Sequence, residues 1–308
     1  MLLRLAFGFS LLSSVAVASP SSPAPLTPSD QASFVVGGTA VPEGKWRDVV
    51  LVVSQDSTCT GTLIAPDIVL TAGHCIESQP YEVIADTVDY TRGGDRIPVK
   101  SSRAYPDWEN KFDVGILMLE HVARGRPRSI APACAAKQGL RDGVMVHLVG
   151  FGMTSDTNPN NTQLREADLR ISDASCTTDD SCQASVAPHG EFLAGGNGEG
   201  SCFGDSGGPV FLNTKEGAAL VGIVSRGLAM PGSTCSDGGV YVRADKVVSW
   251  VQSVTGVDLD PSTCSVPADD AGEAEVEEGG CAAGGSAGLG LGLVLLGITR
   301  RRRSRATA

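Results

Sequence analysis

The sequence predicts an all-β fold of the sandwich or barrel class, with one helix near the end of the domain. Short runs rich in β-branched residues alternate with turn residues at positions 49–53, 61–64, 68–71, 115–119, 145–150, 220–224 and 240–243. Many short strands with little helix are typical of β-sandwiches and β-barrels. A chain of 308 residues is long enough for one such domain with extensions.

The first 18 residues have the pattern of a secretory signal peptide. Arg4 supplies a basic start, residues 5–12 form an apolar run, and Ala16-Val17-Ala18 matches a small-residue cleavage site. We therefore expect export to a compartment that permits disulfides. Residues 19–34 are rich in Pro and Ser, which disfavours a helix or an interior strand, and are predicted to be an extended propeptide.

The most specific motif is Gly-Asp-Ser-Gly-Gly-Pro at positions 204–209. Ser206 is a candidate nucleophile, and a serine hydroxyl needs a base, an orienter for that base and donors aimed at the oxyanion. The N–H groups of Gly204 and Ser206 are candidates for those donors. The alternative is a plain turn, since these are ordinary turn residues. A chance match to all six positions has a probability on the order of 10⁻⁵ on equal residue frequencies, which favours catalysis.

Three motifs together resemble the chymotrypsin-like serine endopeptidases, which share the trypsin fold. They are Thr71-Ala72-Gly73-His74-Cys75, Asp113-Val114-Gly115-Ile116-Leu117 and the 204–209 segment. Their order along the chain, His then Asp then Ser, is also that of the family. The resemblance covers residues 35–256, and it implies two packed six-stranded antiparallel barrels with a C-terminal helix and the active site in the cleft between the barrels.

The resemblance implies peptide-bond hydrolysis through an acyl-enzyme. Ser206 would attack the scissile carbonyl, His74 would accept the serine proton, and Asp113 would orient His74. Gly204 and Ser206 would form the oxyanion hole. No metal or organic cofactor is expected for the reaction. Some members of the family hold a structural calcium, but residues 81–96 offer no ligand set that we can assign.

The resemblance also implies activation by cleavage before Val35. Val35-Val36-Gly37-Gly38 is similar to the family's mature N-terminus, whose new amine pairs with the aspartate that precedes the nucleophile, here Asp205. A buried carboxylate without a partner is strongly unfavourable, so this pairing would fix the Asp205 segment. Phe34 stands before the cleavage point, where animal zymogens commonly have Arg or Lys. We expect either self-processing after Phe34 or cleavage by another secreted protease that is not trypsin-specific.

The primary specificity pocket is expected to accept apolar or aromatic side chains. Gly200 falls at the pocket floor, with Ser201 beside it, and a glycine has no carboxylate to balance a buried Lys or Arg. Gly227 and Gly239 fall on the walls and leave the pocket open. The preferred residue on the acyl side of the cut would be Phe, Tyr, Leu or Met. An inward-facing Asp237 would restore affinity for basic residues, and this alternative stays open.

Ser225-Arg226-Gly227 resembles the segment that pairs with the substrate backbone as an added strand. Arg226 replaces an aromatic residue that is common in the family. This departure argues against the usual apolar subsite next to the pocket. A guanidinium at this position would favour acidic residues further along the substrate.

Nine cysteines in an exported chain indicate several disulfides and one leftover thiol. The resemblance implies two bridges, and short spacing favours a third that closes a smaller loop than the family's usual bridge in that region. A fourth pairing is left open. In that order, the pairs are Cys59–Cys75, Cys202–Cys235, Cys176–Cys182 and Cys134–Cys264, and Cys281 is left over.

The expected helix covers residues 245–254. Val247, Trp250, Val251 and Val254 follow the i, i+3, i+4, i+7 rule, and Gly256 offers a stop. This helix is expected to dock on the domain and to take no part in chemistry.

The end of the chain changes composition after Gly256. Residues 257–280 are rich in Asp, Glu, Pro, Ser and Gly and are predicted to be a solvated spacer. Cys281, the Gly-rich apolar run 282–299 and four arginines at 300–303 resemble the MYXO-CTERM sorting signals of myxobacterial surface proteins, in which the cysteine is processed by a sorting enzyme. A plain membrane anchor is the alternative, although 18 residues are short for a bilayer span.

A formal charge of −11 argues against a nucleic-acid partner. The sequence therefore predicts a secreted or surface-anchored serine endopeptidase that acts on protein or peptide substrates. The alternative is a catalytically silent binding module on the same fold.

Overall fold

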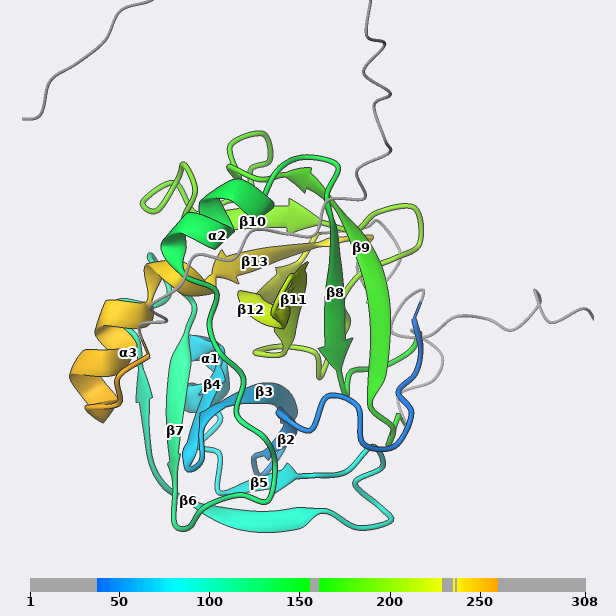
Figure 1. Cartoon of the computed structure of the whole chain (residues 1–308), viewed down its shortest axis with the longest axis vertical. Coiled ribbons are helices and arrows are strands. Elements are labelled where there is room, and N and C mark those ends of the chain that lie inside the picture. Colours follow the sequence, from blue (N-terminus) through cyan, green and yellow to red (C-terminus); the bar gives the residue numbers. More distant parts are fainter. Residues whose placement is uncertain (1–37, 156–160, 229–234, 236, 260–308) are drawn as a thin grey trace, which may run out of the picture. The chain divides into compact units, whose positions relative to one another are not determined.

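The computed structural model describes residues 38–155, 161–228, 235 and 237–259. The predicted signal peptide, propeptide and new N-terminus at Val35 lie outside the described residues, as do Cys264, most of the spacer and the tail with Cys281. Within the described part, the strands form two antiparallel barrels (Figure 1). All seven predicted strand segments lie in strands, so the predicted all-β class is confirmed.

The first barrel closes in the order β2-β3-β4-β7-β6-β5. Its apolar interior is formed by side chains such as Val50, Leu63, Val69, Ile97 and Leu117. The burial of these β-branched and aliphatic residues stabilises the closed barrel. Closure also leaves no strand edge exposed. Its strands are β2 (Val49–Val53), β3 (Thr58–Ala65), β4 (Ile68–Thr71), β5 (Glu82–Ala85), β6 (Asp95–Ala104) and β7 (Gly115–Leu119).

The second barrel closes through pairing of β8 with β9, and the short strand β1 (Thr39–Ala40) adds to the outside of β9. Strand β9 shows why the sequence folds this way: Ala167, Leu169 and Ile171 are buried while the residues between them are exposed, which is the period of two that a half-buried strand requires. The barrel strands are β8 (Met145–Gly150), β9 (Arg165–Asp173), β10 (Glu191–Ala194), β11 (Pro209–Thr214), β12 (Gly217–Gly227) and β13 (Gly239–Arg243).

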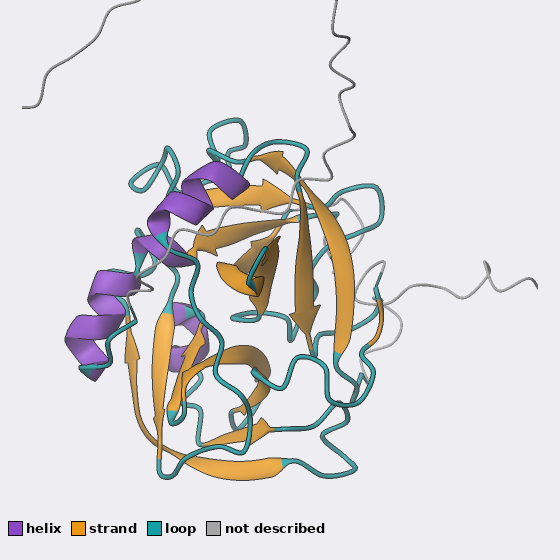
Figure 2. Cartoon of the chain, viewed as in Figure 1, coloured by secondary structure: helices purple, strands orange, loops and turns teal. Residues whose placement is uncertain are grey.

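The helices of the described residues are few and short (Figure 2). The predicted helix 245–254 is in fact a 3-10 turn, η2 (Ala244–Lys246), followed by α3 (Val248–Thr255), which ends at Gly256 with φ of +72° as expected. Val247 and Val251 are fully buried, which confirms the docking face. The two other helices are α1 (Gly73–Glu77) and α2 (Ala133–Gly139). None of these helices is long and apolar enough to span a membrane.

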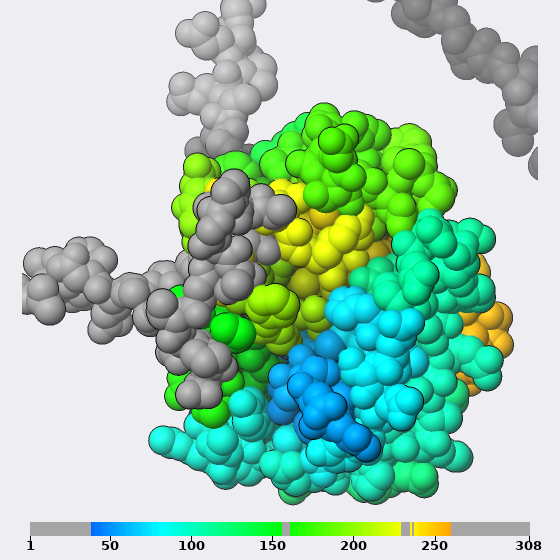
Figure 3. All heavy atoms as spheres, turned by 180° about the vertical axis from the view of Figure 1, so that it is seen from behind, coloured from blue at the N-terminus to red at the C-terminus, as the bar shows by residue number. Residues whose placement is uncertain are grey.

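The two barrels contact each other through a stacked aromatic pair and through the loop that carries Ser206. Trp46 stacks on Phe211 of β11 with ring centroids 4.5 Å apart, and the Arg128 guanidinium lies within 5.4 Å of both ring centroids. Seen from behind, blue and cyan atoms of the first barrel occupy one half of the molecule and green and yellow atoms of the second barrel the other (Figure 3). The boundary between the barrels therefore brings together residues that are far apart in sequence.

Candidate active site

His74 and Asp113 face each other on the first barrel. His74 lies on α1, directly after β4, and Asp113 lies just before β7. One carboxylate oxygen of Asp113 accepts from the His74 backbone N–H at 3.0 Å, and the other lies 2.8 Å from His74 Nδ1. Gly73 makes this approach possible, because a Cβ at Gly73 would lie 2.8 Å from the Trp108 ring and 3.1 Å from Asp113 Oδ1. The imidazole is therefore held at one nitrogen, which leaves Nε2 for chemistry.

Asp113 is buried, and a second side chain completes its hydrogen bonding. Ser225 Oγ donates to Asp113 Oδ2 at 2.7 Å. Burial opposes ionisation of this carboxyl group, but the hydrogen bonds from His74 and Ser225 outweigh it, and the pKa of Asp113 lies below its ordinary value. The carboxylate is therefore ionised at neutral pH. Ser225 was predicted as a substrate contact, and this second role was not foreseen.

Ser206 belongs to the second barrel, but its loop is fixed to the first barrel by Thr60 of β3. The Thr60 N–H donates to the Ser206 carbonyl at 2.9 Å, and Thr60 Oγ1 donates to the Gly204 carbonyl at 2.7 Å. Cys75 Sγ lies 3.7 Å from the same Ser206 carbonyl. The loop thus sits beside the segment that carries His74. Both side chains lie in the described part of the chain, and Ser206 Oγ makes no hydrogen bond to His74 in this structure.

The backbone of the loop presents two free donors. Gly204 has φ of +96°, a conformation that side chains disfavour. Neither the Gly204 N–H nor the Ser206 N–H donates to an acceptor anywhere in the described ranges. A pair of unengaged N–H groups beside a candidate nucleophile has the composition of an oxyanion hole.

Asp205 is completely buried, with its carboxylate against the Gly150-Phe151-Gly152 segment of the second barrel. It accepts from the Gly152 N–H at 2.8 Å and the Cys202 N–H at 3.0 Å. A Cβ at Gly150 or Gly152 would overlap this carboxylate, which explains both glycines. Burial raises the pKa of Asp205 to about 7, although the two N–H donors act against it. Among the described residues, no Lys, Arg or His pairs with it.

The predicted pocket residues converge at one end of the β12–β13 pair. Gly227 and Gly239 are register partners on these strands. A Cβ at Gly239 would lie 2.8 Å from Tyr241 Oη and 3.1 Å from Ser201 Oγ, so these two hydroxyls lie where a side chain at this position would be. Gly200 and Ser201 are buried. Tyr241 is fully buried and was not predicted as a pocket residue; its hydroxyl has no well-aligned hydrogen bond among the described residues.

Asp237 is engaged outside this group. Its Oδ1 accepts from the Gly198 N–H at 2.6 Å, in the turn that precedes Gly200. This contact gives the carboxylate a role in holding the 196–199 turn. It does not support the alternative in which Asp237 faces a basic substrate residue.

The Arg226 guanidinium is already paired with a carboxylate of the protein, which argues against the expected preference for acidic substrate residues. It forms two hydrogen bonds of 2.9 Å with the carboxylate of Glu191, which is only 1% exposed. It also donates to the Ser181 carbonyl and to Ser225 Oγ. Glu191 of the protein therefore takes the place of the acidic substrate residue that the sequence predicted Arg226 to bind.

Three predicted disulfides are confirmed: Cys59–Cys75, Cys176–Cys182 and Cys202–Cys235. Cys134 is also disulfide-bonded, but its partner lies outside the described residues, so its pairing with Cys264 stays a prediction. Cys59, His74 and Cys75 bring potential metal ligands within 4.8 Å of one another. Both sulfurs are in a disulfide, and the cluster therefore lacks the thiolates that bind zinc.

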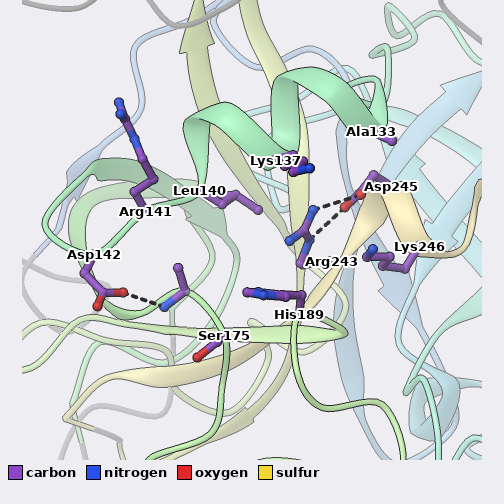
Figure 4. Close-up of a pocket in the computed structure, with 11 residues that line it drawn as sticks. Ala133, Lys137, Leu140, Arg141, Asp142, Ser175, His189, Arg243, Asp245 and Lys246 are labelled. Atoms are coloured by element: carbon purple, nitrogen blue, oxygen red, sulfur yellow. Dashed lines mark hydrogen bonds and ion pairs between the residues drawn. The ribbon is translucent and has the colours of Figure 1, made fainter.

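A separate cavity of about 720 Å³ lies between α2 and the start of η2, and none of the triad residues lines it (Figure 4). Arg243 is buried there and forms a bidentate ion pair with Asp245, while Lys137 and His189 are at the rim. The charge of the buried cation is thus already balanced by the protein.

Comparison with known proteins shows the same family along most of the chain. The sequence profile described as Trypsin matches residues 35–251. A trypsin of Saccharopolyspora erythraea is 31% identical over 225 residues, which cover 68% of this chain and 92% of the relative. Glucanase inhibitor protein 3 of Phytophthora infestans is 30% identical over 265 residues (80% of this chain and 98% of the relative). Glucanase inhibitor protein 1 of Phytophthora sojae is 30% identical over 240 residues (73% and 90%).

Proposed function

Because the chain belongs to the trypsin family, we propose that it is a serine endopeptidase that hydrolyses peptide bonds through Ser206, His74 and Asp113. The observation that carries this proposal is the pair of contacts between the Asp113 carboxylate and His74. Both carboxylate oxygens engage the histidine, at 3.0 and 2.8 Å, on the side of the ring away from Nε2. A buried, ionised carboxylate in this position stabilises the imidazolium that forms during acyl transfer.

The reaction follows from these positions. Ser206 Oγ forms a bond to the scissile carbonyl carbon while its proton passes to His74 Nε2, and the carbonyl electrons move to oxygen. The N–H groups of Gly204 and Ser206 bind that oxyanion. Its collapse breaks the C–N bond, and the amine leaves with the proton from Nε2. A water then attacks the acyl-enzyme with His74 as base, and the acid product is released.

The preferred residue on the acyl side of the cut is proposed to be apolar or aromatic. Gly200, Gly227 and Gly239 contribute no side chains or charges, and Ser201 and Tyr241 contribute uncharged hydroxyls beside Gly239. The described carboxylate nearest in sequence to the wall, Asp237, binds the Gly198 N–H instead. A buried Lys or Arg would therefore be unpaired, which is costly.

Activation is proposed to follow cleavage between residues 34 and 35. Asp205 supports this, because it is a buried carboxylate whose described partners are two backbone N–H groups. A new ammonium at Val35 would supply the positive charge that the Asp205 carboxylate lacks. It would thereby fix the position of the 204–206 loop and of the Gly204 N–H. Since Phe34 fits the proposed specificity, the enzyme would cut its own precursor. A purified Ser206→Ala precursor that matures alone as fast as wild type would rule this out.

Residues 1–18 are proposed to direct export, 19–34 to be the propeptide, and 257–280 to be a spacer to a surface-sorting tail at 281–308. Three disulfides in the described part of the chain support an oxidising compartment. Cys281 would be the site of a sorting enzyme, which would leave the protein on the cell surface. Mass determination of the cell-bound protein tests this, because an intact C-terminus would contradict processing at Cys281.

The decisive experiment for the activity combines N-terminal sequencing with a fluorophosphonate label. Secreted wild type is expected to begin at Val35 and to take up label. Ser206→Ala is expected to keep its uncleaved N-terminus and to take up no label. A panel of Phe, Leu, Ala and Arg substrates then reports the pocket. Preference for Arg would contradict the account of Gly200 but leave the endopeptidase in place.

A second candidate is a non-catalytic binding module, which the names of two relatives favour. Both are called glucanase inhibitor proteins, and they match this chain at 30% identity. The absent hydrogen bond between Ser206 Oγ and His74 is compatible with this function, although catalytic hydrogen bonds often tighten only when substrate binds. Correctly processed, folded protein that takes up no label would contradict the peptidase and favour the binding module.

A further inference from the structure

Arg226 connects the candidate triad to a buried acid. It lies at the end of β12, next to Ser225. Its Nη1 donates to both Glu191 Oε1 and Ser225 Oγ at 2.9 Å, and its Nη2 donates to Glu191 Oε2 at 2.9 Å. A bidentate pair of this kind fixes the guanidinium in one plane. The position of Nη1 relative to Ser225 is therefore set by Glu191.

Ser225 passes this constraint on to Asp113. Its hydroxyl oxygen accepts from Arg226, and its proton goes to Asp113 Oδ2 at 2.7 Å. A hydroxyl that accepts from a cation is a stronger donor and has fewer orientations open to it. The contacts thus form one continuous series from Glu191 through Arg226, Ser225 and Asp113 to His74.

Glu191 is itself held by the segment that directly follows the small disulfide loop. Its Oε2 also accepts from the Gln183 N–H at 2.8 Å and lies 4.0 Å from Cys176 Sγ. The Gln183 side chain donates to the Glu109 carbonyl at 2.7 Å, and Ser185 Oγ donates to the Asn110 carbonyl. Residues 183–185, which follow the disulfide loop, therefore contact both Glu191 and the segment just before Asp113.

We propose that Arg226 is a positioning residue for Asp113: it orients the Ser225 hydroxyl toward the carboxylate, and Glu191 and the Cys176–Cys182 loop hold it in place. This inference rests on the proposed peptidase function. The charged groups along the series are His74, Asp113, Arg226 and Glu191, and Glu191 balances the charge of Arg226. The cation therefore acts through the Ser225 hydrogen bond.

A purely structural role makes a different prediction. A buried ion pair can often be replaced by apolar residues of similar volume with little loss of stability. If Arg226 only holds the loop, Arg226→Met/Glu191→Met should keep the wild-type pH profile. If it positions Asp113, the freed Ser225 hydroxyl donates less well, Asp113 becomes more basic, and the imidazolium is stabilised. The acid limb of kcat/KM then moves to higher pH.

The control is the pair Arg128–Asp48, which is also bidentate and has an equally buried acid, although Arg128 binds through Nε and Nη2, and none of the contacts of this pair reaches a triad residue. Its Nη2–Oδ1 distance is 2.8 Å with the acid 1% exposed, against 2.9 Å and 1% for Arg226–Glu191. In Arg226→Met/Glu191→Met, kcat should fall on the order of tenfold with KM within about threefold, because a less firmly oriented Asp113 holds the His74 ring less well for proton transfer, and this loss outweighs the gain in imidazolium stability. Arg128→Met/Asp48→Leu should keep kcat and the pH profile.

A second measurement does not depend on turnover. In a Ser206→Ala background, the proton between His74 Nδ1 and Asp113 is expected to give a far-downfield NMR resonance. It should move in Arg226→Met/Glu191→Met and in Ser225→Ala, with no additional effect when the changes are combined, and stay in place in the Arg128 control. An unmoved resonance with an unchanged pH profile would overturn the inference. If the wild type proves inactive, the proposed function fails, and the resonance alone decides the role of Arg226.

Discussion

The backbone N–H of Thr60 donates to the carbonyl of Ser206 at 2.9 Å, and so joins a strand of the first barrel to the nucleophile of the second. The Thr60 side chain adds two further contacts. Its Oγ1 donates to the Gly204 carbonyl at 2.7 Å and accepts from the Phe151 N–H at 3.1 Å. Since Gly204 supplies a proposed oxyanion donor, Thr60 helps to hold the residue that carries this donor.

Thr60→Val should therefore reduce kcat. The change keeps the shape and the backbone hydrogen bond but leaves the Gly204 carbonyl and the Phe151 N–H unsatisfied. We expect kcat to fall on the order of tenfold and stability to fall by roughly 1–3 kcal/mol, the cost of unsatisfied buried polar groups. Steady-state kinetics and urea unfolding measure the two effects. Thr58→Val, at the exposed start of the same strand, is the control and should change neither.

Asp205 makes the stability of the uncleaved precursor depend on pH. Unfolded Asp205 ionises above its ordinary pKa of 3.8, whereas the folded carboxyl keeps its proton up to about 7. The folded state binds more protons in this window, so this group destabilises the precursor as pH rises from 3.8 to about 7. In Asp205→Asn this contribution is absent. Between pH 3.8 and about 7, the free energy of unfolding of the variant should therefore rise relative to that of the precursor by up to roughly 4 kcal/mol.

Chemical unfolding of both proteins in the Ser206→Ala background at a series of pH values measures this difference. The slope of the difference against pH is the readout, because asparagine also loses one N–H contact at every pH. Parallel stability curves for the two proteins would contradict the assignment. Mature protein beginning at Val35 should not show the same slope, since its new ammonium would pair with the ionised carboxylate.

The sequence predicts the triad and the oxyanion glycine because each lies in a short contiguous motif, and it predicts two disulfides through the family resemblance and a third through the short spacing of its cysteines. Thr60, Ser225 as a donor to Asp113, and Glu191 have no such motif. Each acquires its role only when distant strands meet, such as β3 with the 204–206 loop. Arg226 is the clearest example. As a lone cation in the sequence it predicted acidic substrate residues, and only the fold shows that it pairs with Glu191.

The same limit applies to architecture. Strands with near-continuous apolar runs, such as β2 and β4, are evident from sequence. Strand β6 is not, because most of its residues are partly or fully exposed and it contains a proline. The need for glycine at positions 150 and 152 is likewise not evident from the neighbouring sequence. The group that excludes a Cβ there is the Asp205 carboxylate, which is more than 50 positions away.

The size of the pocket should depend on Gly239. In Gly239→Ala, the new methyl group would meet Tyr241 Oη at 2.8 Å and Ser201 Oγ at 3.1 Å, and so would fill the space between the strands. We expect kcat/KM for Phe substrates to fall at least on the order of tenfold, while Ala substrates lose little. The ratio of the two substrates is its own control for a general loss of activity. An equal loss for both would show that Gly239 does not line the pocket.

Asp113→Asn should abolish most of the activity with little effect on the fold. An amide can still accept from the His74 N–H, but it carries no charge to stabilise the imidazolium, and its NH₂ group favours the wrong histidine tautomer. The expected fall in kcat is roughly 10⁴-fold, at nearly unchanged KM. Asp89 offers a matched control: it is similarly buried, at 9% exposure against 7%, and hydrogen bonds, mainly from Thr91, also hold its pKa below the ordinary value. Asp89→Asn should lose some stability and keep kcat. Comparable losses of kcat in the two variants would mean that Asp113 supports the fold and not the reaction.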